Sequence, residues 1–170
     1  KTKINVAIAI WDWPAYFDAK LKQKGIKLNI SKWRRPPQNS SPWDSKAAGL
    51  YMICTLSKHE AEKQGYTDSL MLDHEGNIAE ATSANIFFKD TNDELNTPIP
   101  DSFLDGITRK TVIEIAKSKG IKINERKISP KEIQSFKGCF ITGTAAEITP
   151  VASIKDCTFE VCEMILDLSS

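Results

Sequence analysis

The sequence predicts a mixed α and β fold, because short strand patterns alternate with helical patterns along the chain. Residues 4–10 form an apolar run broken only by Asn5, which is typical of a strand buried on both faces. Ile26, Leu28 and Ile30 alternate with polar residues, as expected for a half-buried strand. Residues 50–64 are instead good helix formers, and Gly65 is placed to end that helix.

The remaining segments continue this alternation. Residues 33–42 contain three prolines, which remove backbone donors and predict an irregular loop. Apolar positions 112, 113, 115 and 116 predict a helix over 109–119 that Gly120 ends. Other patterns predict strands over 69–73 and 78–89 joined by a turn at 74–77, a strand over 121–128, a short helix after the capping box Ser129 to Glu132, a strand over 138–142 and a terminal helix marked by Phe159, Cys162, Ile165 and Leu166.

Length and charge limit the function without naming it. A chain of 170 residues has the size of one domain and can bury a real core. Its 23 basic and 22 acidic residues are scattered without a long block of one sign, so neither nucleic acid nor an anionic membrane is an expected partner. The apolar run at 4–10 is much shorter than a membrane span and has no signal cleavage site.

The cysteines and histidines do not form a metal site. Cys54, Cys139, Cys157 and Cys162 contain no CxxC pair, so the sequence predicts no bound metal. The apolar surroundings of Cys54 and Cys139 favour buried reduced thiols in a cytoplasmic compartment, although an even cysteine count leaves disulfides open. His59 and His74 lie in polar segments and are expected at the surface.

Lys46 is the first candidate for chemistry. Three small residues, Ala47, Ala48 and Gly49, follow it, so a ligand could approach the backbone closely, and Tyr51 lies about one turn further along. A lysine taken alone is most often a solvated surface charge. Its neighbours elsewhere in the chain therefore decide its interpretation.

Three further segments accompany this lysine. Glu80 begins the segment EATSANIFF, and by itself it would be a charge on the solvent face of a strand. Gly106-Ile107-Thr108 precedes a predicted helix, and Gly143-Thr144-Ala145 follows a predicted strand. Such turns supply backbone N–H groups to a phosphate, although Gly-Thr pairs are also ordinary turn material.

In order and spacing, these segments resemble the fold-type IV pyridoxal-phosphate aminotransferases, most closely the branched-chain amino acid aminotransferases. The resemblance covers nearly the whole chain. It implies that residues 1–170 form the large, cofactor-binding C-terminal domain of that fold, a pseudo-barrel of strands surrounded by helices. The family's N-terminal small domain, which supplies an arginine to the phosphate, is absent from this chain, and Arg34 and Arg35 are not expected to replace it.

The resemblance also assigns roles to individual residues. Lys46 becomes the Schiff-base lysine and proton shuttle, with a proton affinity lowered by burial beside a cationic ring. Glu80 becomes the partner of the pyridine nitrogen, Tyr51 donates to the phenolic oxygen and Leu104 packs on the ring. The implied phosphate residues are Gly106, Ile107, Thr108, Gly143 and Thr144, and the implied substrate residues are Tyr16, Thr144 and Ala145. Core packing is the ordinary alternative for Tyr16, Tyr51 and Leu104.

The implied reaction is transamination of leucine, isoleucine or valine with 2-oxoglutarate, in branched-chain amino acid biosynthesis by a cytoplasmic homodimer or other homo-oligomer. The segment GTAAEITPV and Tyr51 favour this subgroup over D-amino acid aminotransferases and aminodeoxychorismate lyases of the same fold. Leu50 and the segment 81–84 depart from the subgroup's pattern, so these two alternatives stay open. A third alternative is a catalytically silent oligomeric domain, and the isolated chain is expected to be inactive.

Overall fold

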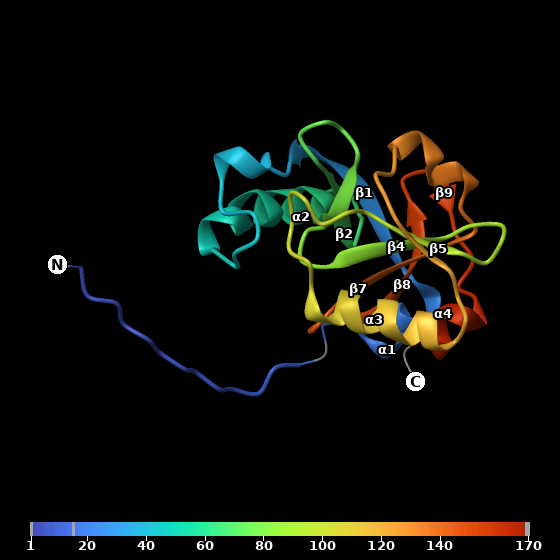
Figure 1. The fold of residues 1–170 in the computed structure, drawn as a ribbon, viewed down its shortest axis with the longest axis horizontal. Coiled ribbons are helices and arrows are strands. Elements are labelled where there is room, and N and C mark those ends of the chain that lie inside the picture. The colour runs from blue at the N-terminus through green and yellow to red at the C-terminus, as the bar shows by residue number, and fades with distance from the viewer. Residues whose placement is uncertain (1, 15, 169–170) are drawn as a thin grey trace.

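The computed structural model describes residues 2–14 and 16–168, shown as a ribbon in Figure 1. Strands and helices alternate along the chain, which confirms the mixed α and β class. The elements are α1 (Ala19–Lys24), β1 (Ile26–Arg34), η1 (Gln38–Ser40), η2 (Ala48–Tyr51), α2 (Met52–Lys63), β2 (Asp68–Leu72), β3 (Ile78–Ala81), β4 (Asn85–Lys89), β5 (Leu95–Thr97), α3 (Ile107–Ser118), β6 (Ile123–Glu125), η3 (Pro130–Ser135), β7 (Gly138–Gly143), β8 (Glu147–Ile154), β9 (Cys157–Thr158) and α4 (Glu163–Asp167).

The strands of the described chain form one mixed sheet that curls on itself. Its order is β3-β2-β1-β8-β7-β4-β5-β6, with β9 beside β8. In a flat sheet, β3 and β4 would lie about 24 Å apart, because neighbouring strands are separated by about 4.8 Å. Only residues 82–84 connect these two strands, and that connection spans at most about 14 Å. The sheet must therefore roll up, which produces the expected pseudo-barrel.

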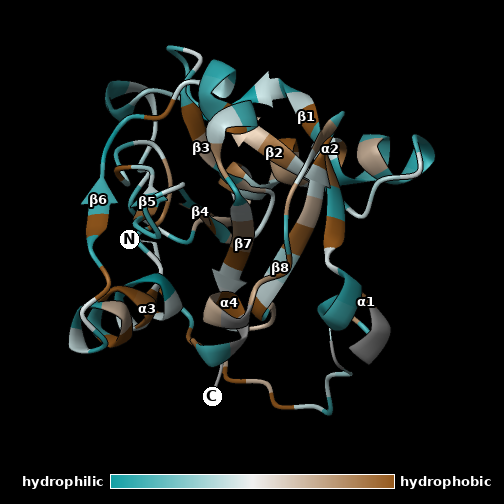
Figure 2. Cartoon of the chain, turned by 90° about the vertical axis from the view of Figure 1, so that its right-hand side faces the viewer, coloured by the Kyte–Doolittle hydropathy of each residue, from teal (hydrophilic) through white to brown (hydrophobic). Residues whose placement is uncertain are grey.

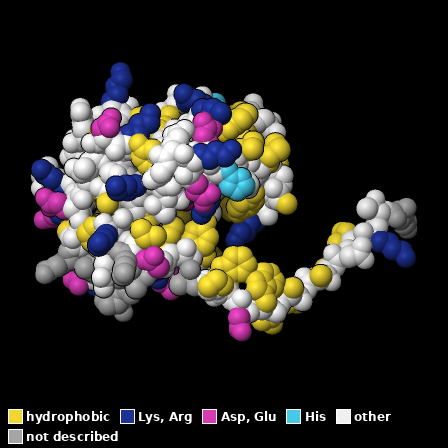
Figure 3. All heavy atoms as spheres, turned by 180° about the vertical axis from the view of Figure 1, so that it is seen from behind, with side chains coloured by type: hydrophobic (Ala, Val, Ile, Leu, Met, Phe, Trp, Pro, Cys, Tyr) yellow, Lys and Arg dark blue, Asp and Glu magenta, His cyan; other side chains and the backbone are white. Residues whose placement is uncertain are grey.

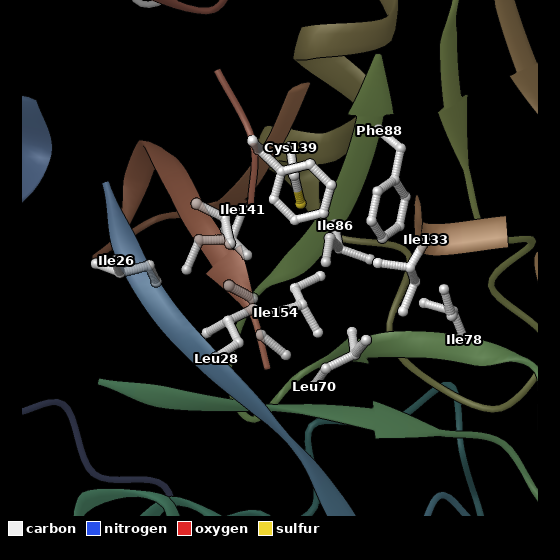
Figure 4. Close-up of a cluster of buried hydrophobic side chains, with 14 of the residues drawn as sticks. Ile26, Leu28, Leu70, Ile78, Ile86, Phe88, Ile133, Cys139, Ile141 and Ile154 are labelled. Carbon is white, nitrogen blue, oxygen red and sulfur yellow. The ribbon is translucent and has the colours of Figure 1, made fainter. Parts of the chain in front are cut away.

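The core fills the inside of this curl. Buried side chains from β1, β2, β3, β4, β7 and β8 meet there, as Figure 4 shows for Leu28, Leu70, Ile86 and Ile141. Hydrophobic segments accordingly run along these strands in Figure 2. Burial of this apolar surface, at roughly 25 cal/mol per Å², is the main force that holds the curled sheet together.

Helices cover the outside of the sheet. α2 packs against β1 and β2 through a face that includes Cys54, Ser57 and Ala61, and α3 packs against β6 and β7. The predicted helix ends at Gly65 and Gly120 are confirmed, since both glycines have positive φ, +82° and +75°. None of the helices in residues 2–14 and 16–168 is both long and apolar enough to cross a membrane.

Residue-level expectations for the capping box, the thiols and the histidines are confirmed. The Glu132 carboxylate accepts from the Ser129 backbone N–H at 2.7 Å, although the helix that follows is 3₁₀. Cys54 and Cys139 are buried and unbridged, and both histidines are exposed. No group of three or more metal-ligating side chains occurs in the described part of the chain.

The predicted strand over 4–10 is wrong. Ile4, Val6, Ile8 and Ile10 are 86–94% exposed, and the segment extends away from the body in Figures 1 and 3. A continuous apolar run indicates burial only if a partner surface is present. Within the described structure β1 already has β2 on one side and β8 on the other, so this run does not pair with it.

Several predicted boundaries also need correction. The predicted strand over 78–89 is two strands, because the chain turns at 82–84 with the Ala81 N–H donating to the Ala84 carbonyl. Only 123–125 of the predicted strand 121–128 is regular, and the terminal helix begins at Glu163. Phe159 and Cys162 precede that helix, and the side chain of Leu166 lies outside the described residues. Strand β8 was not predicted from the sequence.

Candidate active site

A pocket of about 310 Å³ opens where several irregular segments meet at one end of the curled sheet. It lies between the end of β1, the approach to α2, the turn from β3 to β4, the start of α3 and the end of β7. Its lining residues are Arg35, Asp44, Ser45, Lys46, Leu50, Tyr51, Cys54, Glu80, Thr82, Ser83, Ala84, Asn85, Leu104, Asp105, Gly106, Ile107, Thr108, Thr142, Gly143 and Thr144. The pocket therefore brings together sequence motifs that lie far apart along the chain.

Lys46 lies on the pocket wall, in the irregular segment just before η2. Its side chain is exposed, whereas the sequence led us to expect a buried amine. At Gly49 a Cβ would meet nothing within 4 Å, so the segment after the lysine is open. An amine in this position can reach a ligand in the pocket without any rearrangement of the core.

Glu80 forms part of the pocket floor and is only 8% exposed. It is therefore not the solvent-facing charge that its position on a strand would suggest alone. Burial raises the pKa of this carboxyl to about 8; Arg35 opposes the rise, and the nearby Asp68 carboxylate adds to it. At neutral pH Glu80 is consequently mostly protonated, and it can act as a proton donor at the floor of the pocket.

Arg35 is a site residue that reasoning from the sequence missed. Its Nε lies 3.4 Å from Glu80 Oε1, and the side chain is 5% exposed. The guanidinium also donates to the carbonyls of Ser102 (3.2 Å) and Leu50 (3.3 Å) and to Cys54 Sγ (3.3 Å). A buried acid needs a counterion, and arginine is the usual one. That rule could have drawn attention to Arg35, which lies in the predicted loop over 33–42.

Tyr51 lies at the end of η2 and is partly buried at the pocket. Burial raises the pKa of its hydroxyl, with smaller contributions from Glu80 and Cys54. The hydroxyl is therefore protonated at neutral pH and can donate to an acceptor in the pocket.

The start of α3 is suited to an anion. Gly106 is its N-cap, and no side chain caps the first turn, so the backbone N–H groups that begin the helix are left for another acceptor. Asn85 fixes this loop: its Nδ2 donates to the Leu104 carbonyl at 2.9 Å, and its Oδ1 accepts from the Gly106 N–H at 3.2 Å. A Cβ at Gly106 would lie 2.4 Å from Asn85 Oδ1, so this close approach requires glycine.

Arg109, on α3, anchors the same loop through ion pairs and a hydrogen bond. Its side chain is almost fully buried, and it pairs with Asp105 (2.9 Å) and Glu125 (2.8 Å) while donating to the Pro98 carbonyl (3.0 Å). The loop before α3 is thereby tied to β6. Asn85 occurs within the segment EATSANIFF and Arg109 directly follows Gly106-Ile107-Thr108, but the motifs alone do not assign them this anchoring role.

The structure brings together most of the predicted site residues, with two exceptions. Gly143 and Thr144 line the pocket at the end of β7, whereas Ala145 is exposed and does not line it. Tyr16 is also outside the lining, although its hydroxyl lies 3.4 Å from Ser83 Oγ, which does line the pocket. The other predicted pocket residues, Lys46, Tyr51, Glu80, Leu104, Gly106, Ile107 and Thr108, all line it.

Comparison with known proteins agrees with this arrangement. The family model described as amino-transferase class IV matches residues 2–154. The chain belongs to the class IV aminotransferases. A curated relative, the probable branched-chain-amino-acid aminotransferase of Rickettsia typhi, is 47% identical over 147 residues, which cover 84% of this chain and 50% of the relative.

Three solved structures share the fold of this class IV aminotransferase chain. The branched-chain amino acid aminotransferase of the archaeon Thermoproteus uzoniensis with norvaline superposes with a TM-score of 0.84 at 34% identity, covering 90% of this chain and 52% of that one. The Escherichia coli branched-chain amino acid aminotransferase gives 0.88 at 33% identity, covering 93% and 53%. A third, from Brucella abortus, is an aminotransferase bound to the cofactor PLP, with a TM-score of 0.80 at 27% identity, covering 85% and 52%. The chain thus spans about half the length of the relatives that it matches.

Proposed function

We propose that this chain is the large, cofactor-binding domain of a pyridoxal-phosphate-dependent aminotransferase that transfers the amino group of a branched-chain amino acid to 2-oxoglutarate. One observation carries the proposal: an accessible lysine, a buried acid and an uncapped helix start line the same pocket. The names of the related proteins support transamination of branched-chain amino acids and pyridoxal phosphate as the cofactor. A homo-oligomer and a cytoplasmic location remain predictions from the resemblance.

The residues present fit the cofactor. The uncapped first turn of α3, with Gly106 where a Cβ would clash, suits a phosphate group. Glu80 suits a ring nitrogen, since a buried acid beside Arg35 can share a proton with a basic atom. Pyridoxal phosphate, when bound, supplies an aldehyde that reacts with amines and a ring that withdraws electrons from the substrate's α-carbon.

Each residue then has a defined task. Lys46 Nζ would supply the amine that holds the cofactor, and it would move a proton to and from the substrate carbon. Glu80 would face the ring nitrogen with its proton, and Arg35 beside it would stabilise the carboxylate form. Tyr51 donates a hydrogen bond from its neutral hydroxyl. Asn85 and Arg109 keep the loop before α3 in position.

In this proposal, residues of a longer protein, outside 1–170, supply part of the pocket wall. Lys46 is exposed, and Ile107, at the start of α3, is 82% exposed. Positioning effects in catalysis depend on a closed site that excludes water. The chain spans about half of its relatives, which supports a completed pocket in a longer protein.

Borohydride reduction followed by peptide mapping tests the assignment of Lys46. The expected result is one reduced phosphopyridoxyl label, on Lys46, with no label in Lys46→Ala. Lys131→Ala is the matched control, because Lys131 is also exposed but lies outside the pocket. A label on another lysine would refute the assignment.

A further inference from the structure

A chain of polar side chains connects α2 to the pocket floor. Lys58 Nζ donates to the Tyr16 hydroxyl at 2.8 Å and lies 4.5 Å from the centre of its ring. The Tyr16 hydroxyl lies 3.4 Å from Ser83 Oγ, and Ser83 lines the pocket. Tyr16 also packs edge-to-face on the buried Phe17, with ring centres 4.8 Å apart. The tyrosine is therefore held on two sides.

Lys58 belongs to the packed side of α2. Cys54 lies one turn before it and Ala61 one turn after it, and both are buried. Burial disfavours the charge on Lys58, but the hydrogen bond to Tyr16 and the carboxylate of Asp68 outweigh burial and raise its pKa. Lys58 therefore remains an ammonium group at neutral pH, in a half-buried position where a lysine needs a specific partner.

The charge of Lys58 sets the direction of the hydrogen bonds. An ammonium group can only donate, so the Tyr16 hydroxyl accepts from Lys58 and still has its own proton to donate. When Tyr16 donates to Ser83 Oγ, which lies 3.4 Å away, the proton of Ser83 is left for a group in the pocket. The side chain of Ser83 is exposed, so this proton can reach a ligand.

The residues beside Ser83 in the same turn are anchored in a similar way. Thr82 Oγ1 donates to the buried Asp68 carboxylate at 2.6 Å, and Asn85 is bonded to the loop before α3. The floor between β3 and β4 is thus fixed on both sides of Ser83, and Lys58 and Tyr16 fix it at Ser83 itself. A preorganised donor of this kind loses little entropy when it binds an acceptor.

We propose that Lys58 is a positioning residue for substrate binding, which holds Tyr16 in place and makes Ser83 a hydrogen-bond donor toward the pocket. Its acceptor is a carboxylate of the amino acid or oxo acid, because a branched aliphatic side chain contains no acceptor. The proposal rests on the proposed function and adds a residue outside the pocket lining that acts through Tyr16.

The test uses the cofactor-loaded full-length protein that contains this chain. The variants are Lys58→Met, Lys58→Arg and the control Lys63→Met, an exposed lysine on the same helix. The probe is 4-methylvaleric acid, which keeps the carboxylate and carbon skeleton of leucine. Loss of one oriented hydrogen bond should raise the Kd of the probe and the KM for leucine about five- to tenfold in Lys58→Met. The kcat should stay unchanged, Lys58→Arg should retain most of the binding, and Lys63→Met should match wild type.

A double mutant separates positioning from general stabilisation. Ser83→Ala should weaken probe binding as much as Lys58→Met, and the double mutant should be no weaker than either, because both changes remove the same donor. If Lys58→Met does not fold, Tyr16→Phe keeps the ring and should show the same loss. If the losses of probe affinity in the two single mutants add in the double mutant, or if Lys58→Met binds the probe as wild type does, the positioning role of Lys58 is wrong and the proposed function is unaffected. If the wild-type protein neither traps pyridoxal phosphate on Lys46 nor turns over leucine, the proposed function itself is wrong.

Discussion

The buried acid at the pocket floor should make the stability of this chain fall as pH rises through the neutral range. Burial raises the pKa of Glu80 from 4.5 to about 8 in the folded chain. Between these two values the unfolded chain has lost the proton while the folded chain retains it. The folded state binds more protons, so the free energy of unfolding decreases as pH increases. This contribution is fully present below pH 4.5 and is lost by about pH 8.

The size of the effect follows from the two pKa values. Each tenfold change in proton affinity is worth about 1.36 kcal/mol, so the full difference corresponds to about 5 kcal/mol. Such a change in the free energy of unfolding is large beside a typical stability of about 5 to 15 kcal/mol. Burial of Asp68 raises the pKa of that carboxyl too, and it adds a slope of the same sign.

Urea unfolding of the 170-residue chain, followed by circular dichroism at several pH values from about 5 to about 8.5, measures this slope. Glu80→Gln removes the titrating group and should flatten most of the fall. The control is Glu75→Gln, because Glu75 is exposed and its pKa is lowered by the hydrogen bond from Lys127, so it titrates below this range. If Glu80→Gln and Glu75→Gln both keep the wild-type slope, Glu80 is ionised in the folded chain and our account of the pocket floor is wrong.

Other perturbations test neighbouring parts of the site. Arg35→Met leaves the Ser102 and Leu50 carbonyls without their donor and removes the cation beside Glu80, so unfolding free energy should fall by about 1 to 3 kcal/mol; a fall below about 1 kcal/mol in urea titrations would contradict the anchoring role of Arg35. Gly106→Ala places a Cβ against Asn85 Oδ1, so binding of pyridoxal phosphate, followed by absorbance, should weaken at least about tenfold and stability should fall by about 1 to 3 kcal/mol. Gly49→Ala, where a Cβ meets nothing, is the stability control, and equal losses in the two variants would argue against the clash. The isolated chain should fold but transaminate leucine at least about a hundredfold more slowly than the full-length protein, because its pocket is open; equal turnover in a coupled glutamate assay would show that residues 1–170 suffice.

The sequence by itself determined the local features of this protein. Helix ends at Gly65 and Gly120 and the capping box at Ser129 were predictable, because each depends on the conformation of a few neighbouring residues. The alternation at Ile26, Leu28 and Ile30 likewise indicated a strand. Most of the site residues predicted from the sequence line the pocket, and they followed from the order and spacing of motifs that resemble a known family.

The tertiary structure alone decided how distant residues meet. The pairing of Arg35 with Glu80, the anchoring of Gly106 by Asn85 and the chain from Lys58 to Ser83 all depend on how strands and helices distant in sequence pack together, which no local pattern encodes. The exposed run at 4–10 shows the same limit, since an apolar pattern states a preference for burial but not whether a partner surface exists. Local conformational preferences act within a few residues, whereas strand order and counterion choice depend on contacts across the whole chain.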